Sequence, residues 1–242
     1  MLQVLSKEFN SFLNSLIAYI VMGVFLASVG LLMWVFPETS VLEYGYADMS
    51  TLFTLAPYVF IFLVPAITMR SFAEEKKAGT LELLFTKPLS DWDILLGKYF
   101  ACFLLVLLAL LPTVIFYFSL SSLGEPQGNI DTPGVIGSYI GLSLLGGVFC
   151  AIGVFASSVT PDQIVAFIVA AFLCYLAFAG FESLALLNVW SAHALVIKQL
   201  GLLYHYDSLS KGLIDSRNLV YLLSVIALML LFTRLNLGTR SW

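Results

Sequence analysis

Long apolar stretches alternate along the chain with short polar ones, and the apolar stretches are long enough to cross a membrane. Six of them contain no Asp, Glu, Lys, Arg or His: 11–37, 49–69, 99–124, 132–161, 163–181 and 218–233. A spanning α-helix needs about 20 apolar residues, whereas barrel strands alternate apolar and polar residues over about ten positions. The pattern therefore predicts six transmembrane helices, at about 16–36, 53–69, 99–120, 135–157, 163–187 and 218–236.

Residues 2–16 carry a different pattern, with apolar residues gathered along one side of a helix. These apolar positions are Leu2, Leu5, Phe9, Phe12, Leu13 and Leu16. The opposite positions are Gln3, Ser6, Lys7, Glu8, Asn10, Ser11, Asn14 and Ser15. Such a segment is typical of an amphipathic helix that lies in the membrane surface. We expect an interfacial helix over 1–15, either an elbow that carries motion into the first span or a plain anchor.

The connections between the spans are too short to form soluble domains. Those at about 37–51 and 121–133 are far below the roughly 50 residues of a small domain. The connection at 188–217 is longer and moderately apolar, so it can dip into the membrane as a re-entrant pair of short helices. The sequence predicts a single transmembrane domain over 1–242, and any soluble domain must come from another chain.

The composition indicates an all-α integral membrane protein. Hydrophobic residues make up 60% of the 242 residues and charged residues 11%, with a mean hydropathy of +0.99. Ordinary soluble domains are roughly 25% charged and 45–50% apolar. Cys102, Cys150 and Cys174 each lie inside a predicted span without CxxC spacing, so we expect packing residues rather than a metal site or a disulfide.

Lys and Arg residues are unevenly divided between the two sides of the predicted spans. With the N-terminus inside, eight lie on the inner side and only Lys198, Lys211 and Arg217 lie on the outer side. Positive residues favour the cytoplasmic side, which predicts that both termini are cytoplasmic. The first apolar run is longer than a signal-peptide core, so we expect it to be retained.

Charge is concentrated in the segment 70–98, which holds ten of the 26 charged residues (11 Lys and Arg plus 15 Asp and Glu). Five are positive and five are negative: Arg70, Lys76, Lys77, Lys87 and Lys98 against Glu74, Glu75, Glu82, Asp91 and Asp93. Anionic lipid or nucleic acid would favour a basic excess. The balance therefore favours docking of a protein.

Local signals divide this segment into two short helices. The helix of span two should continue to Lys77, since cations suit the negative end of a helix, and Gly79 suits the left-handed position that follows. Thr80 can cap a second helix with Glu82 in its first turn, and Pro88 ends it. This predicts a helix, a turn and a helix along the inner membrane face that dock a partner. A solvated charged loop is the alternative.

Two further caps are expected where spans begin. Ser90 and Asp93 form a capping pair ahead of span three. In the hairpin before span five, Thr160 is expected at the N-cap, Pro161 at the first helical position and Gln163 in a capping box. The hairpin should be a tight, rigid turn, too short to form a large docking site alone.

Two strings resemble the ABC-2 type permeases. They are FAEEKKAGTLELLFTKPLSDWDILLGKY, within 72–99, and FASSVTPDQIVA, at 155–166. With six spans and cytoplasmic termini, the resemblance covers nearly the whole chain. Within the family, the form RSFAEEKKAGTLELL and the small outer loops are most similar to the gliding-motility-associated permease subunits of Bacteroidota. A permease used in maturing a copper enzyme is the alternative.

The resemblance implies a non-catalytic subunit of the bacterial inner membrane, with no cofactor of its own and no nucleic-acid partner. Two such subunits, the same or paralogous chains, would each rest on a cytoplasmic ABC ATPase that holds ATP and Mg²⁺, and a subunit with a periplasmic domain can join them. The ATPase groove would receive a coupling helix formed by Arg70, Glu74, Glu75, Lys76, Lys77, Gly79, Thr80, Glu82 and Pro88. Gly97 and Lys98 do not form a P-loop, because Trp92 replaces its earlier glycine.

The remaining candidate for chemistry is Glu182, in the apolar string FAGFESLALL. It is either an intramembrane polar site or the wetted outer end of span five. His193 and His205 lie twelve residues apart and are expected to be interfacial residues rather than ligands.

Three hypotheses for the function, each from a different class of protein, can be compared with the sequence. The leading hypothesis is the transmembrane permease subunit of an ATP-powered exporter. The rival is a force-transmitting or scaffold subunit that acts on a periplasmic or membrane partner without moving a solute. An intramembrane enzyme is not expected, because the predicted spans lack GxSxG, HExxH or an acid pair.

Overall fold

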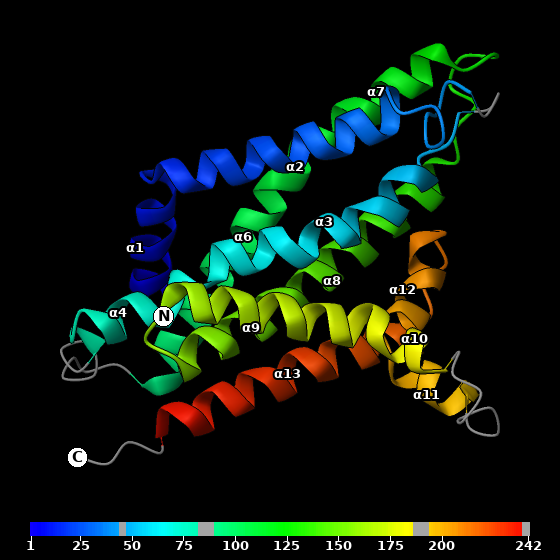
Figure 1. Ribbon diagram of the computed structural model, residues 1–242. Coiled ribbons are helices and arrows are strands. Elements are labelled where there is room, and N and C mark those ends of the chain that lie inside the picture. The colour runs from blue at the N-terminus through cyan, green and yellow to red at the C-terminus, as the bar shows by residue number, and fades with distance from the viewer. Residues whose placement is uncertain (44–46, 82–89, 186–193, 239–242) are drawn as a thin grey trace.

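Figure 1 shows the computed structural model, which describes residues 1–43, 47–81, 90–185 and 194–238. Within these ranges, six stretches of helix are long and apolar enough to cross a membrane, so the predicted all-α architecture is confirmed. They comprise α2 (Leu16–Trp34); α3 (Ser50–Thr68) with α4 (Arg70–Lys77); α6 (Asp91–Leu110), η1 (Leu111–Thr113) and α7 (Val114–Leu123); α8 (Thr132–Val159); α9 (Gln163–Tyr175), η2 (Leu176–Gly180) and α10 (Phe181–Ala185); and α13 (Ser216–Gly238).

The helix α8 lies at the centre of the bundle. Of the six candidate spans it has the largest buried share, 78%, and it packs against α3, α6, α9 and α13. Gly153 allows α3 to come close, since a Cβ at this position would lie 2.0 Å from Thr68 Oγ1. The spans of α9 and α13 are only 22% and 17% buried, so most of their surface faces outward.

The bundle has two distinct ends (Figure 1). The α4 end holds α4, the helix α1 (Leu2–Leu13), the α8–α9 turn and the last turn of α13. The opposite α12 end holds α10 with two short helices, α11 (Ala194–Leu200) and α12 (Leu202–Ser210). Two short helices thus form in this connection, and their entry into the membrane as a re-entrant pair stays a prediction. Residues 188–193 of that connection lie outside the described ranges.

The helix α1 forms as predicted, and Phe9, Phe12 and Leu13 of its apolar stripe pack against the core. The stripe departs from the prediction at its start, because Leu2 is 74% exposed whereas Val4 is buried against α6. A Cβ at Gly97 of α6 would lie 2.9 Å from Val4, which shows how closely the two helices approach. Glu8, predicted on the polar side, faces inward because it pairs with a buried lysine of α6.

The turn between α8 and α9 also differs from the prediction. Thr160 ends α8 in extended backbone, φ −120° and ψ 146°, as a residue that precedes proline does, and it is not the N-cap of α9. Asp162 is the N-cap of α9, and its Oδ1 accepts hydrogen bonds from the amides of Ile164 (2.8 Å) and Val165 (3.2 Å). Asp162 therefore satisfies two amides that have no partner within the helix.

Two segments interrupt the regular α-helices. Pro112 lies in η1, a 3₁₀ turn between α6 and α7, since proline cannot donate the helical hydrogen bond. The segment η2 is a π-helix, which was not predicted. The apolar pattern does not distinguish it from α-helix, because Leu176–Gly180 fits either winding.

Candidate functional site

The helix α4 continues α3 beyond the apolar span and ends at a glycine, as predicted. Gly79 has φ +66°, a left-handed conformation that glycine adopts without steric cost. The amide of Thr80 donates to Glu75 O (3.0 Å) and that of Gly79 to Lys76 O (3.3 Å), the two bonds of a Schellman motif. Lys77, Gly79 and Thr80 are exposed at this tip. Glu82 and Pro88 lie outside the described residues, so the second short helix stays a prediction.

A buried lysine lies directly behind α4. The side chain of Lys98, on α6, is 1% exposed, and its Nζ lies 3.0 Å from Glu8 Oε1 of α1 and 3.0 Å from Glu75 Oε1 of α4. It also donates a 2.6 Å hydrogen bond to the main-chain oxygen of Ser71. The Phe72 ring covers the ammonium at 5.2 Å from its centroid. Three helices that are distant in sequence thus meet on one charge.

Lys7 completes what we call the Lys98 cluster, which consists of Lys7, Glu8, Glu75 and Lys98. Lys7 Nζ lies 3.3 Å from Glu8 Oε1 and 3.5 Å from Glu75 Oε1. Partial burial lowers the pKa of Lys7, but the two carboxylates outweigh that effect and the pKa is raised. Two ammonium groups therefore balance two carboxylates, as buried charges require. Glu75 Oε2 is buried and accepts no hydrogen bond from the described residues.

An ion pair on α4 reaches the start of α2. Arg70 Nε lies 2.8 Å from Glu74 Oε2, and Arg70 Nη1 donates to Ser15 Oγ at 3.2 Å. Ser15 is the N-cap of α2, where the chain turns from α1 into the first span. The side chains of Arg70 and Glu74 are 24% and 48% exposed.

The junction between α3 and α4 is held by one hydroxyl of α8. Ser157 is fully buried, and its Oγ accepts hydrogen bonds from the amides of Phe72 and Ala73, both at 3.0 Å. The same hydroxyl donates to Met69 O at 2.9 Å. Ser157 therefore satisfies main-chain groups on both sides of the junction, which would otherwise be buried without partners.

The next residue of α8 connects two more helices. The main-chain oxygen of Ser158 accepts hydrogen bonds from Lys76 Nζ of α4 and from Asn236 Nδ2 of α13, the latter at 2.7 Å. Asn236 Nδ2 also donates to Ser158 Oγ at 3.1 Å. The two strings that carry the family resemblance, 72–99 and 155–166, thus meet at the α4 end.

The predicted coupling residues fall into two groups in space. Glu75 and Lys76 face the bundle, whereas Glu74, Lys77, Gly79 and Thr80 are exposed. Whether an ATPase contacts the exposed group stays a prediction. An outward charge at Glu75 is not what the structure shows, because its carboxylate pairs with Lys98.

The residues that hold α4 in place were not predicted from the sequence. These are Glu8, Lys98, Ser157, Ser158 and Asn236. For Lys98 the sequence did contain a signal, because the cap at Ser90 fixes the residue at which α6 begins. Lys98 lies three and four residues after Leu95 and Ile94, on the buried face of an amphipathic pattern.

Glu182 lies at the α12 end and has a partner. Its side chain is 44% exposed, and Oε1 lies 3.8 Å from Lys198 Nζ of α11. It lines a cavity of about 1010 Å³ with other polar groups, including His205, Arg217 and Asn218. This favours the wetted end of span five over an isolated intramembrane acid. Both nitrogens of His205 contact oxygens, Asn218 Oδ1 at 2.8 Å and Gln199 O at 2.9 Å.

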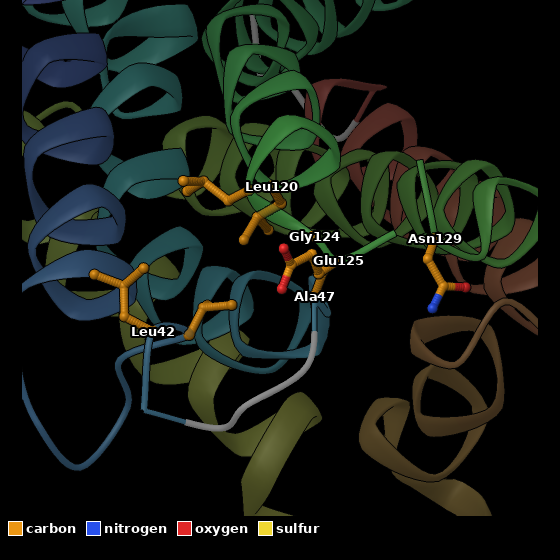
Figure 2. A pocket seen from close by; sticks show the side chains of 8 residues that line it. Leu42, Ala47, Leu120, Gly124, Glu125 and Asn129 are labelled. Atoms are coloured by element: carbon orange, nitrogen blue, oxygen red, sulfur yellow. The ribbon is translucent and has the colours of Figure 1, made fainter. Parts of the chain in front are cut away.

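A second hollow at the same end lies between the α2–α3 and α7–α8 connections (Figure 2). It has a volume of about 430 Å³, and the labelled side chains of Leu42, Leu120 and Glu125 border it. Among the described residues, no group of three or more His, Cys, Asp or Glu could hold a metal ion. The three cysteines are free and buried.

The fold and the site define a class: a multi-span helical membrane subunit with a charged element at one end of its bundle. Residues 37–195 match the ABC-2 family transporter proteins, which is more than half of the chain. The chain therefore belongs to the ABC-2 transporter family, whose members are membrane components of transporters and not the catalytic subunits. Curated proteins gave no match.

Proposed function

We propose that this chain is the transmembrane permease subunit of an ATP-driven exporter. In this proposal a separate cytoplasmic ATPase, which holds ATP and Mg²⁺, docks on the exposed tip of α4 at Lys77, Gly79 and Thr80, next to the α8–α9 turn. ATP-driven movement of the ATPase then moves α4 against the spans. The family match supports a permease, and the exposed charged tip supports a protein partner.

The observation that carries this proposal is the contact of Ser157 with both sides of the α3–α4 junction. A push on α4 acts on Ser157 of α8 through hydrogen bonds of 2.9 and 3.0 Å. Because α8 is the most buried of the six spans, its displacement would be felt by the whole bundle. Packed interiors pass on small shifts because they deform little.

The Lys98 cluster offers a second route, toward the first span. It ties α4 to α1, and the contact of Arg70 with Ser15 ties α4 to the start of α2. Movement of α4 would therefore turn α1 and α2 together. These contacts favour the elbow over the plain anchor as the role of α1.

The cellular setting in this proposal follows from charge and resemblance. We assign the α4 end and both termini to the cytoplasm, since eight of the eleven Lys and Arg belong to the segments that the sequence predicts to be inner. The membrane is then the bacterial inner membrane, and a second copy or a paralogous chain pairs with this one. A role in gliding motility or secretion is supported by the string RSFAEEKKAGTLELL alone. The copper-enzyme permease remains its alternative.

The test is a cysteine crosslink from α4 to a co-expressed ATPase. Lys77→Cys is the probe, because Lys77 is exposed at the tip of α4 and the native cysteines are buried. Lys211→Cys is the matched control, an exposed lysine at the α12 end. We expect a crosslinked permease–ATPase product only with Lys77→Cys, and less of it when vanadate traps ADP on the ATPase after hydrolysis.

Failure of any nucleotide-binding subunit to co-purify in mild detergent, or equal crosslinking from both positions, would refute the docking site. An assay in vesicles that contain the assembled complex then distinguishes export from the force-transmitting alternative. ATP-dependent solute movement supports export. An ATP-dependent change in a bound periplasmic partner without solute movement supports the force-transmitting alternative.

A further inference from the structure

The hollow between the α2–α3 and α7–α8 connections presents aliphatic side chains just beyond the ends of two spans (Figure 2). The helix α2 ends at Trp34 and α7 ends at Leu123, so the hollow lies at the α12 end of the bundle and not along its apolar sides. Of its lining residues, Val41 and Leu120 are buried, whereas Leu42 and Leu123 are each 61% exposed. The hollow therefore has an apolar floor and an apolar edge that is open to a partner.

A neighbouring hollow extends this surface toward α8 and α12. It has a volume of about 380 Å³ and shares Ala47 with the first hollow. Its lining includes Phe53 of α3, Val135 of α8 and Lys211 at the end of α12. The residues that line the two hollows form one continuous surface, which we call the outer depression. An extended peptide advances about 3.3 Å per residue, so one segment can place side chains in both hollows.

The two connections that frame the outer depression carry negative charge only. The sequence has no Lys, Arg or His at 35–69 or 99–134, and these connections hold five acids: Glu38, Glu43, Asp48, Glu125 and Asp131. Glu43 and Glu125 are exposed. Among the described residues that line the two hollows, Lys211 is the one cation, and its Nζ lies 2.7 Å from Asp207 Oδ2. The surface therefore favours a basic partner.

The charges at the α12 end argue against a second copy of this chain as that partner. The cations predicted on the outer side are Lys198, Lys211 and Arg217. Two of them are already paired, because Lys198 Nζ lies 3.8 Å from Glu182 Oε1 and Lys211 Nζ lies 2.7 Å from Asp207 Oδ2. A second copy would thus offer few free cations to the acidic connections, and the occupant should come from a different chain.

Insertion of the exposed leucines into the lipid headgroups is the other alternative. Anionic headgroups attract basic segments, so they would repel the carboxylates that accompany Leu42 and Leu123. Five acids without a basic residue beside them are therefore unfavourable for an anchor in the membrane surface. A basic protein segment would bury the same leucines and also compensate the charge.

We propose that the outer depression docks a segment of a protein partner on the outer side of the membrane, and that this segment combines Lys or Arg with an apolar side chain. The apolar side chain fills the hollow beside Leu42 and Leu123, and the flanking cations pair with Glu43 and Glu125. Burial of the apolar side chain provides affinity, whereas the charges select and orient the partner. The proposal rests on the proposed orientation, with the α12 end outside the cytoplasm, and not on the proposed coupling to an ATPase.

The first experiment measures binding of short fluorescent peptides to the full chain in phosphatidylcholine nanodiscs. One peptide has Lys and Arg on both sides of a central Phe, the second has Ser in place of Phe, and the third has Glu in place of the cations. We expect the first peptide to bind about tenfold more tightly than either of the others. Its binding should weaken as salt is raised, because salt screens exposed charges.

Variants of the outer depression show where the peptide binds. Leu42→Asn should weaken binding of the first peptide about tenfold. Leu213→Asn is its control, because Leu213 is 65% exposed at the same end and lines neither hollow. Each of these substitutions changes an exposed side chain, so the fold should be retained.

The charged edge is tested in the same way. The double variant Glu43→Gln, Glu125→Gln should weaken binding of the first peptide about fivefold, since it removes two exposed carboxylates. The double variant Glu182→Gln, Asp215→Asn removes the same charge outside the two hollows and should leave binding unchanged. Asparagine replaces aspartate well at the start of a helix, so α13 is kept.

The second experiment identifies the occupant in membranes of the native organism. Leu42→Cys is labelled with benzophenone maleimide and irradiated, and Leu213→Cys is the control; the native cysteines are buried. We expect Leu42→Cys to crosslink to a segment of another protein in which Lys or Arg accompanies an apolar residue. The yield should fall when Glu43→Gln and Glu125→Gln are added.

Equal binding of the three peptides, or equal effects of Leu42→Asn and Leu213→Asn, would overturn the proposal. Crosslinking of Leu42→Cys only to lipid or only to a second copy would also overturn it, in favour of an anchor or a self-interface. Labelling of Lys211→Cys by an impermeant maleimide from the cytoplasmic side alone would overturn the orientation on which the proposal rests. Loss of the ATPase partner would overturn the proposed coupling and leave these results unchanged.

Discussion

Replacement of Lys98 by methionine tests whether the Lys98 cluster holds α1, α4 and α6 together. Methionine has nearly the same length and no charge, so the change removes the ammonium with little loss of packing. Glu8 and Glu75 then face each other without Lys98, which had been 3.0 Å from each. The variant should be strongly destabilised.

The magnitude follows from the balance of attraction and desolvation. At 3.0 Å and an effective dielectric constant of about 20, each ion pair contributes roughly 5 kcal/mol of Coulomb energy. Most of this gain offsets the several kcal/mol that burial costs each ion, but removal of one partner leaves the others desolvated and costs about 3–5 kcal/mol. Lys7 still faces both carboxylates, so we expect about 3 kcal/mol, the low end.

The assay is thermal unfolding of the purified full chain in a single detergent. For a chain of this size, 1 kcal/mol corresponds to about 2–4 °C, so Lys98→Met should lower the melting temperature by about 6–12 °C. Lys77→Met is the matched control, an exposed lysine at the tip of α4 that should change stability by no more than about 0.5 kcal/mol. The triple variant Glu8→Gln, Glu75→Gln, Lys98→Met should recover most of the loss, because it leaves fewer buried charges.

Equal melting temperatures for Lys98→Met and Lys77→Met would refute the argument. A triple variant as unstable as Lys98→Met alone would show that the loss came from packing and not from uncompensated charge.

Two further predictions concern the same end of the bundle. Gly79→Ala should destabilise the chain by about 1–2 kcal/mol in thermal unfolding, because φ of +66° is unfavourable for a residue with a Cβ. Ser157→Ala should cost about 1–3 kcal/mol, because it leaves the amides of Phe72 and Ala73 buried without their acceptor. Hydrogen exchange should show faster exchange at these two amides.

The controls for both predictions lie on exposed parts of the chain. Gly23→Ala, inside α2 with no atom within 4 Å of the added Cβ, should be neutral or slightly stabilising. Ser119→Ala removes an exposed hydroxyl that bonds only within α7 and should leave stability unchanged. A loss with Gly23→Ala as large as that with Gly79→Ala, or unchanged exchange at Phe72 and Ala73 in Ser157→Ala, would contradict these arguments.

Features that depend on a few neighbouring residues were predictable from the sequence. The spans follow from apolar runs, because a helix in hydrocarbon must satisfy its own main chain. The end of α4 at Gly79 and the capping box of Ser90 with Asp93 follow from residues at most four positions apart. The prediction that Thr160 caps α9 was wrong, although it also rests on neighbouring residues. Asp162 is a second capping residue two positions later, and it is the one that caps the helix.

The sequence by itself thus determined that this is a six-span helical membrane protein whose charge gathers at one connection. Only the tertiary structure decided what that charge does. Glu8 and Lys98 are 90 residues apart, and Ala73 and Ser157 are 84 apart, so no local pattern pairs them. Because these groups are buried, each needs its partner: a charge or an amide that is removed from water is unfavourable unless it is paired or hydrogen-bonded. Within the described part of the charged connection, the structure therefore separates an inner face that holds the bundle from a tip whose residues Lys77, Gly79 and Thr80 are exposed.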